Sequence, residues 1–207
     1  VVHNCLNITI EDISKRPRKV NIVHKDQRND LALLRLTSSE MASKATKALI
    51  SKLGINIVPL ANHGLLRSED VKLGEGIVVA GYPYGDILGD TIKVTTGVVS
   101  AVMGLANNSA EFQVDAAVQP GNSGGPIYDK YGNIVGVVVS QLNKFQFAKT
   151  LGTLPENVNF AIKGSTVRQF LTSNGLQTKW SNRTQNLSTQ KIAQIAESQT
   201  VLIRCGN

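Results

Sequence analysis

Cysteine and aromatic residues are scarce in this sequence, and no long hydrophobic run interrupts it. Its 207 residues include two cysteines, Cys5 and Cys205, which are too few for a framework of disulfides or for a zinc site. No apolar stretch approaches the roughly 18–20 residues that a membrane span needs, so we expect no membrane-spanning segment. No secretory signal peptide is recognisable. The 42% hydrophobic content is nevertheless enough for one sizeable globular unit or two small ones.

Acidic residues are in the minority, with 15 Asp and Glu against 22 Lys and Arg, and the formal net charge is +7. A basic balance can indicate nucleic acid or another polyanion as a partner. Here the basic residues are scattered, and the densest cluster, residues 15–19, is interrupted by Pro17. A nucleic-acid surface would interleave aromatic with basic side chains, whereas aromatics make up 5% of the chain. We therefore predict a solvated basic loop and no nucleic-acid partner.

Eighteen glycines and many Val and Ile runs favour β-structure over a helical bundle. Alternating or β-branched runs bounded by turn residues predict strands over residues 18–36 (around a polar turn at 26–29), 77–80, 92–103 (with a bulge or kink at Gly97), 112–118 and 158–162. Residues 127–128 and 134–140 are expected to form a hairpin across 129–133. Residues 40–54 fit a short helix or a loop. Ser165 is expected to cap a short helix through Leu171, and Ser188 is expected to cap a last helix over 189–198, before a strand at 201–204. Many short strands with few helices predict an all-β sandwich or barrel with short C-terminal helices.

The sharpest chemical feature is the hexapeptide GNSGGP at residues 121–126. A serine hydroxyl is a weak nucleophile at neutral pH and needs a base and an anion-stabilising pocket. Glycines beside a serine let the backbone turn tightly and direct its N–H groups to one point. The N–H groups of Gly121 and Ser123 are thus candidates for an oxyanion hole with Ser123 as the nucleophile. Taken alone, the segment would fit an ordinary glycine-rich turn equally well.

The surroundings of the hexapeptide resemble the nucleophile region of trypsin-like serine proteases, most closely the bacterial HtrA-like branch. The segment VVHNC at residues 1–5 looks like the end of the family's histidine motif, and RNDLALLRL at 28–36 resembles its aspartate motif. The segments at 79–85, 95–101 and 159–162 are similar to other strands of the family. The order His, Asp, Ser matches the family's order. The resemblance implies a serine endopeptidase with His3, Asp30 and Ser123 as its catalytic residues and no cofactor or metal.

His3 would take the proton of Ser123 and return it to the leaving amine, while Asp30 would hold the imidazole tautomer. Two other histidines are weaker candidates for the base. His24 precedes Asp30 by only six residues and lacks the motif, and His63 follows Asp30 and breaks the order. Asp115 matches no catalytic position and is expected to bind nearby backbone.

The resemblance also suggests how substrate is held. Asn122 stands where activated digestive-type enzymes carry an aspartate that pairs with a new N-terminus, and an amide cannot form that ion pair. Ala117, six residues before Ser123, implies a neutral specificity pocket for small or medium apolar side chains. An extended polypeptide substrate is expected to lie against the strand that contains Val138, Val139, Ser140 and Gln141.

Two antiparallel β-barrels with the site between them are implied by the family, with their boundary near residues 65–75. The protease domain would span 1–175, its first strands would precede Val1, and the N-terminal barrel is expected to be truncated. Residues 176–207 are expected to form a linker, helix and strand, too few for the PDZ domain of many HtrA-like proteases. Cys5 resembles a cysteine whose usual partner would lie ahead of Val1, so a Cys5–Cys205 bridge is not the expected pairing. The family implies a periplasmic or secreted location.

The alternative function is a catalytically inactive, protease-like binding or chaperone module. The two differ in whether Ser123 reacts, because a binding module would keep the fold and lose the chemistry. The sequence does not indicate an oligomeric state or a physiological substrate.

Overall fold

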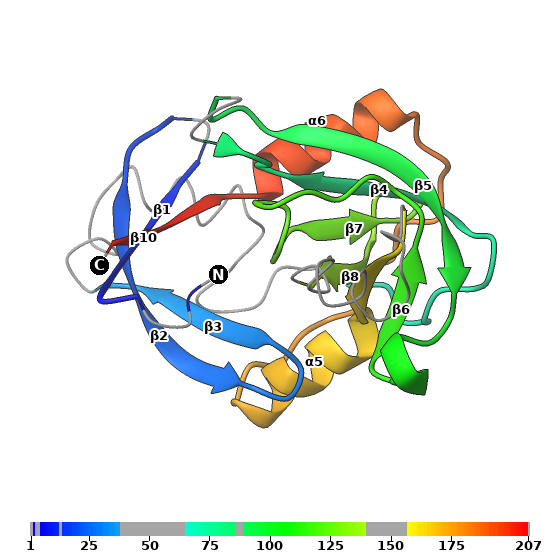
Figure 1. Cartoon of the computed structure of the whole chain (residues 1–207), viewed down its shortest axis with the longest axis horizontal. Helices are drawn as coiled ribbons and strands as arrows, with labels where there is room; N and C mark the ends of the chain where they lie inside the picture. Colours follow the sequence, from blue (N-terminus) through cyan, green and yellow to red (C-terminus); the bar gives the residue numbers. More distant parts are fainter. Residues whose placement is uncertain are drawn as a thin grey trace, which may run out of the picture.

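The structure of the chain, a computed structural model, describes residues 2, 5–12, 14–37, 65–85, 89–139 and 157–206. Two β bodies lie side by side, a four-stranded sheet and a closed barrel of six strands (Figure 1). Neighbouring strands are antiparallel in both bodies. The predicted all-β class with short C-terminal helices is confirmed. The helix or loop expected over residues 40–54 lies outside the described residues.

The first sheet joins the two ends of the described chain. Its spatial order is β10-β1-β2-β3. The strands are β1 (Asn7–Glu11), β2 (Arg18–Asp26), β3 (Leu31–Leu36) and β10 (Leu202–Gly206). The hairpin of β2 and β3 is the one predicted over 18–36. Strand β1 was not predicted, although Ile8 and Ile10 alternate with polar residues and are buried together with Val20.

The closed barrel carries the main hydrophobic core. Its strand order is β4-β5-β6-β9-β8-β7, and β7 pairs with β4 to close it. The strands are β4 (Gly76–Gly81), β5 (Lys93–Ala101), β6 (Glu111–Val114), β7 (Pro126–Tyr128), β8 (Ile134–Val138) and β9 (Asn159–Lys163). A 3-10 helix, Leu105–Asn107, lies between β5 and β6. Phe112, Val114, Ile127 and Ala161 are fully buried inside, so burial of apolar surface holds the barrel closed.

Two details of the barrel differ from the sequence prediction. The run at 112–118 was expected to be one strand, but β6 ends at Val114 and an irregular segment follows. The bulge or kink expected at Gly97 is not there, since Gly97 pairs regularly with Ile77 and the register shift against β6 lies between Val99 and Ala101. Gly97 has a different physical role, because a Cβ at this position would collide with the backbone of Ala116.

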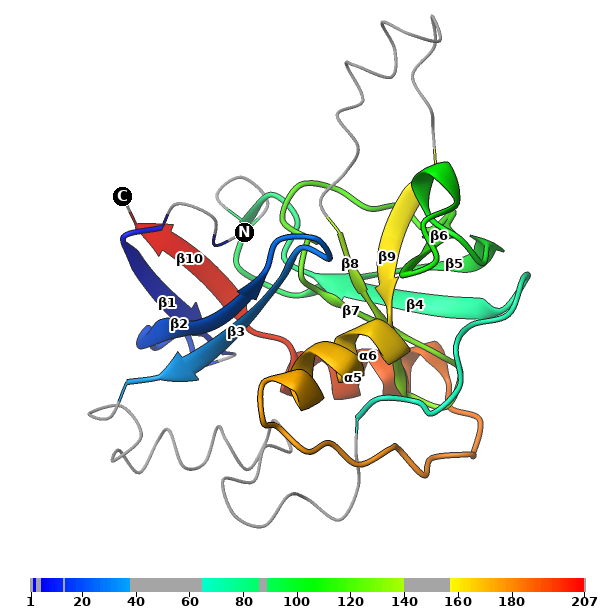
Figure 2. The same ribbon diagram turned by 90° about the horizontal axis from the view of Figure 1, so that it is seen from below.

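Two helices pack against the barrel, and in the view of Figure 2 both lie below its strands. Helix α5 (Gly164–Ser173) contacts β8 and β9 of the barrel and also β3 of the first sheet. Ser165 was expected to cap this helix, but no side chain caps it and the Ser165 hydroxyl binds the Asp70 carboxylate at 3.0 Å. Because α5 contacts both bodies, it helps to fix their relative position.

Helix α6 (Thr189–Gln199) begins as predicted, with the Ser188 side chain accepting a hydrogen bond from the Lys191 backbone N–H at 3.2 Å. It buries Ile192 and Ala196 against a barrel surface that includes Tyr128. After α6 the chain leaves the barrel, and β10 adds to the free edge of β1. The expected C-terminal strand is therefore observed as part of the first sheet. That sheet, in the described part of the chain, is open rather than a complete second barrel.

Candidate active site

Ser123 lies in the loop that leads into β7, and the shape of this loop depends on Gly121. The φ angle of Gly121 is +101°, in the region that favours glycine. A Cβ at this position would collide with the carbonyl oxygen of Tyr82, in the turn after β4. The loop is closed by a hydrogen bond from the Asn122 N–H to the Gln119 carbonyl at 3.0 Å and one from the Gly125 N–H to the Asn122 carbonyl at 2.9 Å. Only glycine therefore fits where the chain turns just before Ser123.

The two backbone N–H groups expected to bind an oxyanion are those of Gly121 and Ser123. Within the described ranges, neither donates a hydrogen bond to a protein acceptor. Gly121 is exposed and Ser123 is half-buried, so a ligand can reach both. Unpaired backbone donors beside a nucleophile candidate are a suitable site for a developing negative charge.

The loop is also joined to β8. The Gly124 N–H donates to the Val138 carbonyl at 2.8 Å, and the Val138 N–H donates to the Gly125 carbonyl at 2.9 Å. The next N–H along the strand, that of Val139, donates to the Phe160 carbonyl at 3.1 Å. Both backbone groups of Val138 are thus used within the protein and position Ser123. Ser140 and Gln141, also expected along the substrate, lie outside the described residues.

A cavity of about 390 Å³ opens beside Ser123. It is lined by three segments that are far apart in the sequence: Gly81 and Tyr82; Pro120, Gly121 and Ser123–Gly125; and Thr200–Ile203. Ala117, Val138 and Val139 are not among its lining residues. Ala117 is exposed, and its carbonyl accepts a hydrogen bond from the Thr95 hydroxyl at 2.9 Å. The cavity and the expected specificity pocket are therefore different places around the same serine.

Asp30 ends the turn between β2 and β3, on the first sheet, and is exposed with a φ of +50°. The turn is held by Asp26, whose carboxylate accepts hydrogen bonds from the Arg28 N–H at 3.0 Å and the Asn29 side-chain amide at 2.7 Å. The Asn29 hydrogen bond is the main reason that the pKa of Asp26 lies below its usual range. His3 lies outside the described residues, so the assembly of His3, Asp30 and Ser123 stays a prediction. His24 is exposed at an irregularity in β2.

Asn122 and Asp115 support the loop without lining the cavity. Asn122 is only 4% exposed, its side chain packs against Gly81, and no described residue is a hydrogen-bond partner of its Oδ1 atom. The Asp115 carboxylate accepts a hydrogen bond from the Val98 N–H at 2.6 Å, which confirms the structural role expected for it.

Sequence reasoning missed Tyr82, Tyr84 and the C-terminal segment. The Tyr84 N–H donates to the Pro120 carbonyl and its hydroxyl to the Gln119 side chain, both at 3.0 Å. The Tyr82 hydroxyl donates to the Thr200 carbonyl at 3.3 Å. Burial, with the nearby charges of Glu197 and Asp12, raises the pKa of Tyr82. The Gly and Pro residues at 81–85 indicate a turn, but the local sequence does not indicate that this turn contacts the serine loop.

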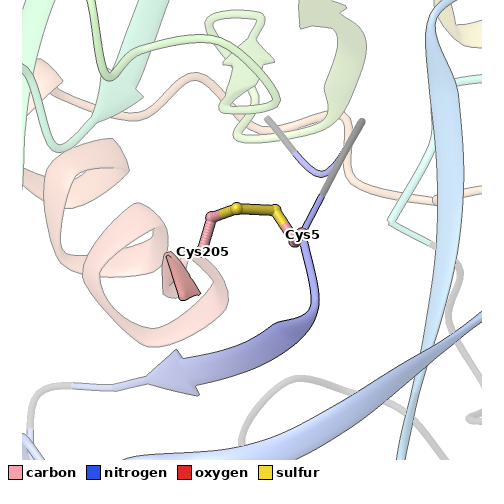
Figure 3. Close-up of a disulfide and its surroundings, with 2 residues drawn as sticks. All are labelled: Cys5 and Cys205. Atoms are coloured by element: carbon pink, nitrogen blue, oxygen red, sulfur yellow. A yellow bond between two sulfur atoms is a disulfide. The ribbon is translucent and has the colours of Figure 1, made fainter. Parts of the chain in front are cut away.

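A disulfide joins Cys5 to Cys205, with 5.2 Å between their Cα atoms (Figure 3). The sequence left the disulfide state of these two cysteines open and did not favour this pairing, which the structure shows. β10 pairs with β1 so that Ile8 lies opposite Cys205, and Leu6 donates its N–H to the Gly206 carbonyl at 3.2 Å. This pairing brings together cysteines that are 200 residues apart.

Among the residues that the structure describes, no group of three or more His, Cys, Asp and Glu side chains is arranged to hold a metal ion. No helix in those same ranges is long and apolar enough to cross a membrane.

A closed antiparallel barrel beside a second antiparallel sheet, with a serine in a glycine-rich loop, is the architecture of the trypsin-like proteases. The family model described as a trypsin-like peptidase domain matches residues 1–137. The chain belongs to this family, and its resemblance to the HtrA-like branch is confirmed by its relatives.

Two curated relatives and one solved structure illustrate the match. Uncharacterized protein y4bJ of Sinorhizobium fredii is 35% identical over 99% of this chain and 29% of its own length. A probable periplasmic serine endoprotease DegP-like of Hahella chejuensis is 31% identical over 66% of this chain and 25% of its own length. The serine endoprotease of Yersinia pestis aligns with 84% of this chain and 50% of its own, with a TM-score of 0.58 and 23% identity, which supports the fold. The chain thus spans less than a third of these two curated relatives.

Proposed function

We propose that the protein is a serine endopeptidase that cleaves unfolded or extended polypeptides, with Ser123 as its nucleophile. The observation that carries the proposal is the loop at Gly121 and Ser123. It holds a half-buried hydroxyl beside two backbone N–H groups that have no acceptor among the described residues, at the edge of an open cavity. This arrangement suits the attack of a hydroxyl on a carbonyl better than it suits a passive turn.

In the proposed reaction, His3 removes the Ser123 proton as the serine oxygen bonds to the scissile carbonyl carbon. The carbonyl oxygen gains negative charge and accepts hydrogen bonds from the Gly121 and Ser123 N–H groups. The carbon–nitrogen bond then breaks, the leaving amine takes the proton from His3, and an acyl-enzyme remains. Water, deprotonated by His3, releases the acid product and restores Ser123. Asp30 orients the imidazole and stabilises its charged form throughout.

The neutral environment expected around Ala117 favours small or medium apolar side chains before the scissile bond. A periplasmic or secreted location is part of the proposal. Disulfides persist in oxidising compartments, and the chain has one between Cys5 and Cys205. The Hahella relative is named as periplasmic.

The proposal is tested by cleavage of a denatured, fluorophore-quenched protein. The unmodified protein is expected to cleave it, and Ser123→Ala to lose at least about a thousandfold in rate. Asp30→Asn should lose activity while retaining a folded chain. Ser100→Ala, which removes an exposed hydroxyl on β5, is the matched control and should be unchanged. Binding of the denatured protein without cleavage would instead favour the inactive binding module.

A further inference from the structure

The C-terminal segment Thr200–Ile203 forms one wall of the cavity that contains Ser123. The serine loop lines the same cavity with Pro120, Gly121 and Ser123–Gly125. The segment reaches this position because the chain leaves α6, crosses to the first sheet and enters β10 (Figure 1). Residues about 80 positions after the nucleophile are therefore brought against it.

Several bonds fix this wall in place. The Tyr82 hydroxyl binds the Thr200 carbonyl at 3.3 Å. β10 pairs with β1 over five residue pairs, and the disulfide joins their ends. Arg204 bonds to Glu11 at 3.1 Å and to Asp90 at 3.0 Å. A wall held by neighbours on both sides is preorganised, so a ligand does not have to order it.

The cavity lies on one particular side of Ser123. An extended substrate bound at the serine continues in both directions from the scissile bond. The half that becomes the acyl group is expected near Ala117 and along the strand after Val138, and neither residue lines this cavity. Among the residues that the structure describes, the direction past Gly121 toward Thr200–Ile203 is the one left for the half that departs with the amine.

Leu202 is the wall residue best placed to select a substrate. Val201 and Ile203 pack against the first-sheet core around Ile8, Ile10 and Val20. Side chains alternate along a strand, so Leu202 lies on the opposite face. It is half-buried, lines the cavity and is not part of that core cluster. Tyr82 and Pro120 also line the cavity, and their side chains are largely apolar.

From this geometry we infer that Thr200–Ile203 is the leaving-group subsite of the protease, and that Leu202 makes it select an apolar residue directly after the scissile bond. The inference rests on the proposed function and adds a specificity that comes from the C-terminal strand. The cavity volume of about 390 Å³ is in the range of binding pockets, roughly 300–1,000 Å³, and accommodates a large side chain.

The test uses quenched peptides that are identical before the scissile bond and carry Leu, Gly or Asp after it. The unmodified protein is expected to prefer Leu over Gly by about tenfold in kcat/KM, and Leu202→Ala to remove most of this preference. A peptidyl methyl ester with the same acyl half places nothing against the wall and should be hydrolysed equally by both. Leu73→Ala, a truncation of a 70% exposed leucine outside the cavity, is the matched control.

A second variant, Leu202→Phe, keeps the inference testable if Leu202→Ala folds poorly. Leu202→Phe fills the subsite, so preference should move from Leu toward Gly while hydrolysis of the ester persists. If the Leu-over-Gly ratio is the same in the unmodified protein and both Leu202 variants, the inference is overturned while the protease function stands. If the unmodified protein hydrolyses neither peptide nor ester, the proposed function fails, and the inference fails with it.

Discussion

Cys5 is covalently bonded to Cys205, which fastens the first described strand of the chain to the last one. Cys5 is two residues from the predicted base, His3, and Cys205 is in the strand that continues from the cavity wall at Thr200–Ile203. One bond therefore links the segment expected to carry the base with a segment that lines the nucleophile's cavity.

Removing this disulfide should destabilise the protein substantially. A cross-link between residues 200 positions apart removes much conformational freedom from the unfolded chain, and loss of a native disulfide in a small domain costs about 2–5 kcal/mol. The double variant Cys5→Ser and Cys205→Ser is expected to unfold at a lower urea concentration than the oxidised protein. With a dithiol reductant present, both proteins should unfold at the same midpoint. Equal midpoints without the reductant would contradict the prediction.

Substituting Gly121 should impair catalysis more than it impairs folding. Gly121→Ala adds a Cβ that collides with the Tyr82 carbonyl and displaces an N–H of the expected oxyanion hole. Loss of one such donor lowers kcat by about 10²–10³.

Gly74 provides the control for Gly121→Ala. Its φ is +76°, and a Cβ there would meet nothing within 4 Å. Gly74→Ala therefore carries the cost of the left-handed backbone, roughly 1–2 kcal/mol, without the collision. Thermal melts and peptide cleavage should separate the two variants, because only Gly121→Ala should lose activity. Equal activity in both would show that the Gly121 position is not part of the reaction site.

The ion pair of Glu75 and Arg67 should make stability depend on acidic pH. Burial alone would raise the pKa of Glu75, but the hydrogen bonds from Arg67 and from the Lys72 N–H, with their charges, hold its pKa below the usual range. Arg67 also reaches the fully buried Asp129 at 3.3 Å. A depressed folded-state pKa stabilises the protein above the unfolded-state pKa, and this stabilisation is lost as the pH falls through the folded-state value.

Glu75→Gln tests this pH dependence. At neutral pH it should lower the free energy of unfolding by about 1–2 kcal/mol, since one partner of a charge-assisted hydrogen bond loses its charge. The difference from the unmodified protein should shrink as the pH is lowered toward 3, measured by urea unfolding across a pH series. Glu69→Gln, at an exposed carboxylate outside this pair, is the control. A difference that is constant with pH would contradict the assignment.

Local patterns in the sequence were enough for much of the fold. The hairpin of β2 and β3 and helix α6 with its Ser188 cap were predicted, because alternation and capping act within a few residues. The Gly121–Ser123 loop was also predicted, since glycine marks the turn directly. The end of β6 was misplaced because Ala116, Ala117 and Val118 are apolar enough for a strand. In the structure the carbonyls of Ala116 and Ala117 instead accept hydrogen bonds from the side chains of Asn159 and Thr95.

The contacts between distant segments could not be read from such patterns. The pairing of β1 with β10, the disulfide and the cavity wall at Thr200–Ile203 all arise because α6 directs the chain back to the first sheet. The local sequence around Cys5 and Leu202 does not indicate which distant residues they contact. The supporting role of Tyr82 likewise depends on where β4 ends relative to a loop about 40 residues later.

The most direct test of the account is the reaction of the folded protein with a fluorophosphonate, followed by intact-mass and peptide mass spectrometry. We predict one adduct on Ser123, formed at a rate that falls sharply in Asp30→Asn and after unfolding in urea, because only the assembled site activates the hydroxyl. A folded protein that forms no adduct on Ser123, or that reacts equally well when unfolded, would contradict the claim that this serine is a nucleophile.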